Sequence, residues 1–329
     1  MRLVKSLALA VLCGAAGTAF GQYSSPELMM VTDSGGTLAN GTVVAPRIER
    51  YDPYTGAYLG SFGTGYVTNP YGIAVIGQDA YVSDPFTYNG TQYSRIDVFN
   101  FSTGAYDGSV FSTSPYNIWG LAKYGTYLLA SDAGNTSTGA DAVVYTFNSS
   151  GTETSFYTMP SGTFPMSIAA DSSHDYVATY EGGLYSYNLN STGVTTSLNF
   201  HATPADYLYG VAVNEGDVFA AGYSSTNSDG QILEYNTSGV LQGTYTSTSN
   251  TPYSLAFGHN GMLYALTNDN TIQRFDGNYN IEYGPLGSFD LSETADAERI
   301  AVYAAPEPAS MFGLALGALA LIARRRRRK

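Results

Sequence analysis

The nine residues Ile48–Gly56, IERYDPYTG, contain the pattern that decides the fold: an aliphatic residue, two variable residues, an aromatic residue, then Asp or Asn. Residues Ile96–Gly104, IDVFNFSTG, repeat it. Asp or Asn before a polar segment with Gly favours a tight turn, so each copy predicts a strand that ends in a hairpin. The intervals between the aromatic residues of the six copies are 48, 48, 40, 48 and 40. These aromatic residues are Tyr51, Phe99, Phe147, Tyr187, Tyr235 and Phe275.

Each copy belongs to a longer repeated unit. Upstream lie two short apolar segments separated by a turn, such as Ile73–Val75 and Ala80–Asp84, and a further short segment follows, such as Ala105–Phe111. Each unit therefore predicts four short strands within about 45 residues, which is typical of one blade of a β-propeller.

The two ends of the repeat region complement each other. Residues 27–62 supply strands two to four of a unit, while Ile300–Tyr303 supplies only a first strand. Together they complete a sixth blade and close the ring, which removes exposed sheet edges. We therefore predict an all-β fold, a six-bladed β-propeller with four strands per blade, over residues 22–304. A pair of β-sandwiches is the alternative, but it does not explain six equal units of which one is split.

This body resembles bacterial propellers of the NHL and lactonase-like kinds, although it lacks their diagnostic residues. Composition agrees with a folded domain, because 44% of the residues are hydrophobic and only 12% are charged. Residues 23–305 hold 26 acidic and six basic residues, a net charge of −20. Such an anionic body argues against nucleic acid as a partner, and it predicts that an acidic polysaccharide would need bridging cations.

Residues 1–21 have the features of a secretory signal peptide. Arg2 and Lys5 precede the apolar run Leu7–Ala16, and small residues around Gly21 predict cleavage there by signal peptidase. A buried N-terminal helix is the alternative. The only cysteine, Cys13, lies in this segment, so the mature protein would have no disulfide, no thiolate metal ligand and no Cys nucleophile.

Residues 305–329 have three parts in a fixed order. Pro306, Glu307 and Pro308 precede the apolar run Ala309–Ala323, and five Arg and one Lys follow. The segment resembles the PEP-CTERM sorting signal of Gram-negative bacteria. The resemblance implies that an exosortase, a membrane cysteine protease, recognises the Pro-Glu-Pro motif and removes the tail, and that the protein reaches the cell surface or an exopolysaccharide matrix.

The apolar run itself predicts a transmembrane helix over 309–323. It would anchor the chain transiently in the inner membrane, with the basic residues on the cytoplasmic side. A simple anchor that is retained is the alternative.

In a propeller, the residues just before the innermost strands meet at one rim of the central channel. Aromatic faces there suit a sugar, because the apolar face of a pyranose stacks on a ring. We predict a ligand site made of Tyr71, Trp119, Tyr209 and Tyr253, in line with Met166 and Glu298. The alternative is that the aromatic residues plug the channel. Long polar loops are expected on the same rim at 34–45, 85–94, 133–141 and 223–230.

Acidic residues give a candidate metal site on this rim. Asp33, Asp84 and Asp132 end the second strands of their blades, and Glu298 precedes an innermost strand. Ca²⁺ takes several oxygen ligands, so we keep it as a candidate cofactor held by these four carboxylates, while caps on turns are the alternative.

A histidine site is not expected. The turns of His174 and His259 belong to the opposite rim, and His201 is predicted in a loop. The sequence also contains no phosphate-binding glycine loop and no nucleophile motif.

Three functions follow from these patterns. The first is an exported, non-catalytic propeller of the cell surface or matrix that binds exopolysaccharide or a surface protein. The second is a metal-dependent hydrolase or lyase of the lactonase kind, with its site in the channel. The third is a purely structural scaffold.

Overall fold

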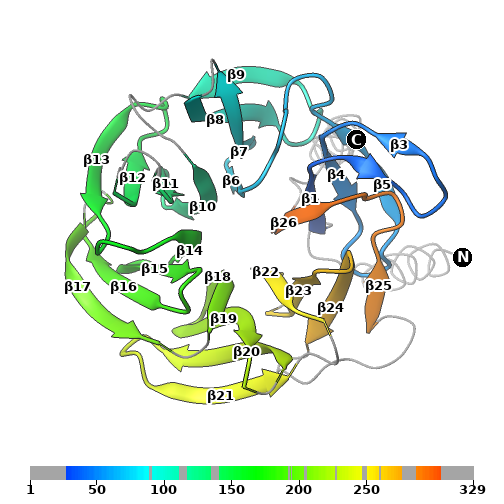
Figure 1. Cartoon of the computed structure of the whole chain (residues 1–329). Helices are drawn as coiled ribbons and strands as arrows, with labels where there is room; N and C mark the ends of the chain where they lie inside the picture. The colour runs from blue at the N-terminus through cyan, green and yellow to red at the C-terminus, as the bar shows by residue number, and fades with distance from the viewer. Residues whose placement is uncertain are drawn as a thin grey trace, which may run out of the picture. The chain divides into compact units, whose positions relative to one another are not determined.

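Six four-stranded sheets stand around a common axis, each with its first strand innermost (Figure 1). The computed structural model describes residues 27–304, apart from 89–90, 111–116, 135–140, 192, 194, 204–205, 227, 247–249, 259–260 and 276–286. Residues Leu28–Tyr303 form one compact unit. The predicted signal peptide, the Pro306–Pro308 motif and the apolar run 309–323 lie outside the described residues.

Five blades consist of consecutive strands. Blade 2 contains β6 (Ile73–Ile76), β7 (Asp79–Tyr88), β8 (Thr91–Asn100) and β9 (Tyr106–Val110). Blade 3 contains β10 (Ile118–Tyr124), β11 (Tyr127–Asp132), β12 (Val143–Phe147) and β13 (Glu153–Thr158). Blade 4 contains β14 (Pro165–Ala170), β15 (His174–Thr179), β16 (Leu184–Leu189) and β17 (Thr195–Ala202). Blade 5 contains β18 (Tyr207–Asn214), β19 (Asp217–Ser224), β20 (Asp229–Asn236) and β21 (Leu241–Thr246). Blade 6 contains β22 (Pro252–Phe257), β23 (Leu263–Thr267), β24 (Thr271–Phe275) and β25 (Ser288–Asp290).

Blade 1 joins the two ends of the body. Its strand order is β26 (Ala297–Ala304), β1 (Glu27–Asp33), β4 (Arg47–Tyr51) and β5 (Tyr58–Phe62), so the innermost strand comes from the far end of the chain. Thr32 in β1 connects β26 with blade 2. Arg299 N in β26 donates to Thr32 Oγ1 at 3.0 Å, and this hydroxyl group donates to Tyr71 O, just before blade 2, at 2.7 Å. The predicted six-bladed propeller and its split blade are confirmed.

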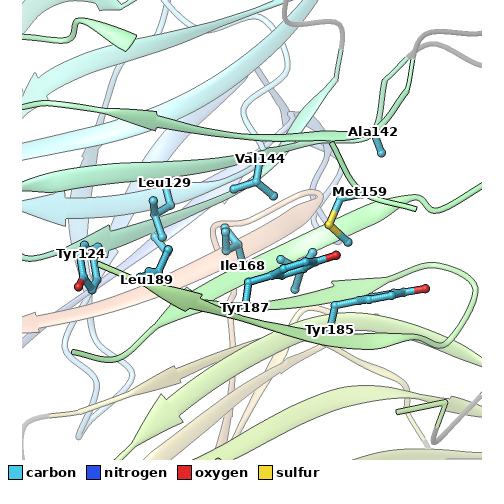
Figure 2. Close-up of a cluster of buried hydrophobic side chains, with 11 residues drawn as sticks. Tyr124, Leu129, Ala142, Val144, Met159, Ile168, Tyr185, Tyr187 and Leu189 are labelled. Carbon is cyan, nitrogen blue, oxygen red and sulfur yellow. The ribbon is translucent and has the colours of Figure 1, made fainter. Parts of the chain in front are cut away.

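The repeated aromatic residue ends the regular part of the third strand and is buried in every blade, with exposed fractions of 0–8%. These side chains join six separate apolar clusters, one between each pair of adjacent blades. Figure 2 shows the cluster between blades 3 and 4, where Leu129 and Val144 face Ile168 and Tyr187. Since each cluster draws on two blades, the apolar core itself runs around the ring and keeps neighbouring blades together.

The turn after the third strand explains the Asn or Asp of the repeat. Asn100 Oδ1 accepts the backbone N–H of Thr103 at 3.0 Å, and Asp52 Oδ1 does the same for Tyr54 at 2.8 Å. Gly104 closes the turn with a φ of +74°, and a Cβ added to it would lie 2.6 Å from Phe62 Cβ in blade 1. The turn therefore packs on the outer strand of the preceding blade, and only glycine fits its backbone.

Three predicted loops, 85–94, 34–45 and 223–230, differ from the structure, and so does the predicted position of His201. Residues 85–88 and 91–94 continue β7 and β8 as a long hairpin, because Phe, Thr and Tyr there favour strands. Within 34–45, β2 (Gly36–Thr37) pairs with β3 (Val43–Val44), and in 223–230 only 225–228 lies between strands. His201 lies in the edge strand β17 and stacks on its cross-strand partner Tyr185 at 4.1 Å, so its prediction as a loop residue is wrong. Residues 135–140 and His259 lie outside the described residues.

Candidate functional site

In blades 3 to 6, a β-bulge at the start of the innermost strand directs one side chain into the channel. In blade 3, Ile118 pairs with Asp132 and Gly120 with Ser131, so Trp119 is the extra residue between them. Met166, Tyr209 and Tyr253 occupy the same position in blades 4, 5 and 6. A bulge turns a side chain away from the regular alternation of a strand, so these residues face the channel.

These side chains converge on one cavity of about 670 Å³. This volume lies within the range of small-molecule sites. All six residues of the predicted rim row line it, and they are joined by three residues from the loops of blade 4 and by one basic residue from β26. The lining is Tyr71, Trp119, Phe164, Met166, Tyr180, Glu181, Tyr209, Tyr253, Glu298 and Arg299. We call this space the rim cavity.

Aromatic rings form two walls of the rim cavity. The rings of Tyr71 and Trp119 lie 4.7 Å apart at 33°, and those of Tyr209 and Tyr253 lie 4.8 Å apart at 53°. Tyr180, 45% exposed, continues the second wall outward, with its ring 6.1 Å from that of Tyr209. The four aromatic residues predicted from the sequence therefore come together, while their role in binding stays a prediction.

Arg299, which the sequence analysis did not single out, also borders the rim cavity. Its side chain is only 6% exposed, yet it carries a guanidinium group. Nη1 donates to Glu298 O at 2.7 Å, and Nη2 donates to Met166 O of blade 4 at 3.0 Å. A signal was present: the residues after the rim row are Gly72, Gly120, Ser167, Gly210 and Ser254 in the other blades, and only blade 1 has a long side chain there.

Glu298 is the titratable acid of the predicted rim row. Burial raises its pKa to about 7, although the positive charge of Arg299 acts in the opposite direction. Its other charged neighbours are Asp296 and Asp33, which raise the pKa further, while a hydrogen bond from Ser34 lowers it. A carboxyl group with this pKa exchanges its proton near neutral pH and can both accept and donate hydrogen bonds there.

The tyrosines of the cavity stay protonated at neutral pH. Burial, reinforced by the charge of Glu298, raises the pKa of Tyr71 to about 12. Burial raises the pKa of Tyr209 to about 12 as well. Both hydroxyl groups therefore remain hydrogen-bond donors for a ligand.

The three aspartates of the candidate metal site each serve their own blade. Asp84 Oδ1 accepts the backbone N–H of Thr68 at 2.9 Å and of Asn69 at 2.6 Å. Asp132 Oδ1 accepts the N–H of Asn117 at 2.8 Å, and Asp33 Oδ1 accepts that of Asp296 at 3.0 Å. In each case the carboxylate fixes the loop that enters the innermost strand.

These carboxylates are not gathered into one ligand set. Among the described residues, no group of three or more His, Cys, Asp or Glu side chains is arranged to hold a metal ion. Asp33, Asp84 and Asp132 do not line the rim cavity, and of the four candidate ligands only Glu298 does. The geometry therefore offers carboxylates as turn caps at three positions, while Glu298 lines the cavity together with Glu181. Ca²⁺ as a cofactor stays a prediction.

Comparison with known proteins identifies one segment. Residues 304–328 match the family model of the PEP-CTERM protein-sorting motif. No curated protein matches the chain, so the resemblance to NHL and lactonase-like propellers stays a prediction. Within the described part of the chain, no helix is long and apolar enough to cross a membrane. The chain thus combines a six-bladed β-propeller with a PEP-CTERM protein-sorting motif, a signal for recognition by an exosortase.

Proposed function

We propose that the propeller is a non-catalytic carbohydrate-binding protein of the cell surface or extracellular matrix, which holds exopolysaccharide in the rim cavity. The sorting motif indicates export and processing toward the cell surface. Removal of the signal peptide by signal peptidase and of residues 305–329 by exosortase, with transient anchoring by 309–323, belongs to the same proposal.

The aromatic walls of the rim cavity carry this proposal. Sugar rings present apolar C–H faces that stack on Tyr and Trp, while their hydroxyl groups need donors and acceptors nearby. Tyr71 and Trp119 form one such surface, and Tyr209 and Tyr253 form the other. Tyr180 and Tyr207, with rings 4.9 Å apart, extend the aromatic surface beyond the cavity, which suits a chain of several sugar units. Because the aromatic residues line an open space instead of filling it, the geometry favours ligand binding over a purely structural scaffold.

Trp119 makes the test direct, because it is the only tryptophan of the chain and it lines the cavity. Its fluorescence is titrated with oligosaccharides prepared from the producer's exopolysaccharide. We expect saturable changes, and at least tenfold weaker binding in Tyr209→Ala and Tyr253→Ala. Tyr66→Ala is the matched control, since Tyr66 is 52% exposed and does not line the cavity. Equal affinity in all of these variants would refute the site.

Glu298 favours one second candidate function, an acid–base reaction on a bound sugar or lactone. With a pKa of about 7, this carboxyl group is suited to donate or accept a proton near neutral pH. The metal-dependent form of this activity would need ligands beyond Glu298. Turnover of a lactone or glycan panel that is lost in Glu298→Gln, with binding intact, would favour the enzyme. No turnover with saturable binding would favour the binding protein.

A further inference from the structure

We propose that the ligand of the rim cavity is an acidic sugar, in which a singly charged group such as the carboxylate of a uronic acid binds to Arg299. This rests on the proposed carbohydrate-binding function and narrows it to one class of sugar. Glu298 and Trp119 complete the contacts around the acidic unit.

Arg299 carries a buried positive charge. Five N–H groups are available on a guanidinium, and the two neutral backbone carbonyls of Glu298 and Met166 accept two of them. Nε has no hydrogen-bond partner, and within the described residues no Asp or Glu forms an ion pair with this side chain. The carboxyl group of Glu298 acts on Arg299 electrostatically, but with a pKa of about 7 it is only partly ionised near neutral pH and compensates the buried cation incompletely, so an anion that enters the cavity meets a strong, localised attraction.

Arg299 is held from two sides of the channel. Its two acceptors belong to blades 1 and 4, which lie on opposite sides of the ring, so the guanidinium bridges the channel (Figure 1). Both acceptors are main-chain atoms of innermost strands, which fixes the group before any ligand binds. Little side-chain freedom is then lost on binding, and a preorganised fork matches a planar carboxylate.

The linings of the two spaces beside Arg299 indicate which side the anion occupies. Arg299 also borders a second cavity of about 400 Å³, which we call the lower channel. The lower channel is lined by the six innermost strands, mostly by small or aliphatic residues, and includes Lys123. The rim cavity holds the aromatic walls, including Trp119, whose Nε1 is a second buried donor without a partner. Two unpartnered donors at one cavity need two acceptor groups, and a uronic acid has both a carboxylate and ring or hydroxyl oxygens.

The charges around the rim cavity favour a singly charged ligand. Glu298 lies beside Arg299 in sequence and lines the same cavity, so a doubly charged phosphate would meet more repulsion than a single charge. A sulfate ester shares the single charge and is a separate arm of the test. The mostly acidic body repels anions at long range, but Arg299 supplies a positive charge inside the cavity, so binding there would need no bridging cation, unlike the expectation from the net charge alone. Affinity should therefore not fall between low and physiological salt, unlike that of an exposed basic patch.

The experiment compares matched sugars by Trp119 fluorescence on the full chain. The probes are trigalacturonate and its methyl ester, in which only the charge is removed. The others are the corresponding trisaccharide of glucuronate, galactose 6-sulfate and inorganic phosphate. EDTA is present in every titration. We expect an acidic trisaccharide to bind at least tenfold more tightly than its uncharged ester, a difference of about 1.4 kcal/mol. The sulfated sugar shows whether the carboxylate or any single negative charge is recognised.

Variants locate the anion. Arg299→Lys keeps a charge but not the fork, and it should lose at least tenfold in affinity for the acid with little change for the ester. Its thermal unfolding midpoint shows whether the ring remains folded, and Arg299→Gln provides a second variant. Lys123→Gln removes a cation from the lower channel and should change nothing.

The outcomes separate this inference from the proposed function. If acid and ester bind equally and Tyr209→Ala weakens both, the cavity binds sugar and the charge assignment is wrong. A loss in Lys123→Gln but not in Tyr209→Ala would place the anion in the lower channel and overturn the proposal. If no acidic or neutral sugar binds, the proposed function itself fails.

Discussion

Asp175 offers a quantitative test of the forces that hold blades 3 and 4 together. Its carboxyl group is fully buried, accepts the O–H of Tyr157 at 2.9 Å and accepts the N–H of Tyr187 at 3.2 Å. Burial raises its pKa from 3.8 to about 7, although these hydrogen bonds act in the opposite direction. The folded protein therefore binds this proton more tightly than the unfolded chain does.

The sign and size of the effect follow from linkage. Because the folded-state pKa is raised, the stabilising contribution is fully present below about pH 4 and is lost as pH rises through about 7. A difference of about three pKa units corresponds to about 4 kcal/mol. Asp175→Asn stays neutral at every pH, its Oδ1 can accept the N–H of Tyr187, and its Nδ2 can donate to the Tyr157 hydroxyl. We expect the variant to match the wild type near pH 4 and to exceed its unfolding free energy at pH 8 by up to about 4 kcal/mol.

The assay is urea unfolding of both proteins from pH 4 to pH 8, followed by circular dichroism. Subtracting the unfolding free energy of the wild type from that of the variant at each pH removes the contribution of every other titrating group. Asp171→Asn is the matched control of opposite sign, because backbone N–H groups of Ser173 and His174 and the O–H of Tyr176 lower the pKa of Asp171. Its loss of stability should shrink as pH falls. A difference between wild type and Asp175→Asn that stays constant over this pH range would refute the reasoning.

Three further predictions concern the turns, the cavity and the tail. Gly104→Ala should lower the unfolding free energy by about 1–3 kcal/mol in urea titrations, because φ is +74° and the new Cβ meets Phe62. Gly125→Ala is the control, since its φ is +59° but open space surrounds it, and it should lower the unfolding free energy by about 1 kcal/mol. An equal loss in the two variants would show that contact with Phe62 is unimportant. Wild-type affinity for trigalacturonate should fall as pH rises through 7, by at most about tenfold per pH unit, because ionised Glu298 repels the carboxylate. Glu298→Gln should remove this pH dependence. A pH dependence that persists in the variant would assign it to another group. Replacing Pro306 and Glu307 with Ala should leave the tail on the protein, as measured by intact mass, and normal trimming would show that the motif is not required.

The ring was predictable because repetition makes local patterns reinforce one another. The aromatic residue followed by Asn or Asp marks a buried side chain and a capped turn in the same place, as at Phe99 and Asn100. The split blade followed from counting strands at the two ends, since an unclosed ring would leave edges exposed. The rim row was also predictable, because residues at equivalent positions of a closed ring converge on its axis.

The contents of the channel were less predictable, because they depend on directions that a sequence does not encode. Asp84 and Asp132 share the rim with the aromatic residues, but backbone N–H groups, and for Asp84 also Arg95, satisfy their carboxylates locally. Arg299 was counted among six basic residues of an acidic body, and only the structure shows that it crosses the channel to Met166. His201 was read as a loop residue because β17 is a polar edge strand without an apolar pattern.

The strand β26 connects Arg299 in the channel to the sorting motif at the C-terminal end of the chain. Arg299 lies near its beginning and Ala304 at its end, about 17 Å away at the usual rise of a strand, and the sorting motif follows directly. If the proposed polysaccharide binds at Arg299 while the tail remains attached, tension between the two would run along this single strand. Such a load acts along β26 and across its hydrogen bonds with β1, so the bonds resist together in shear and are not peeled apart one by one. Under such tension, the strand that closes the ring would therefore also carry the load between the ligand site and the tail.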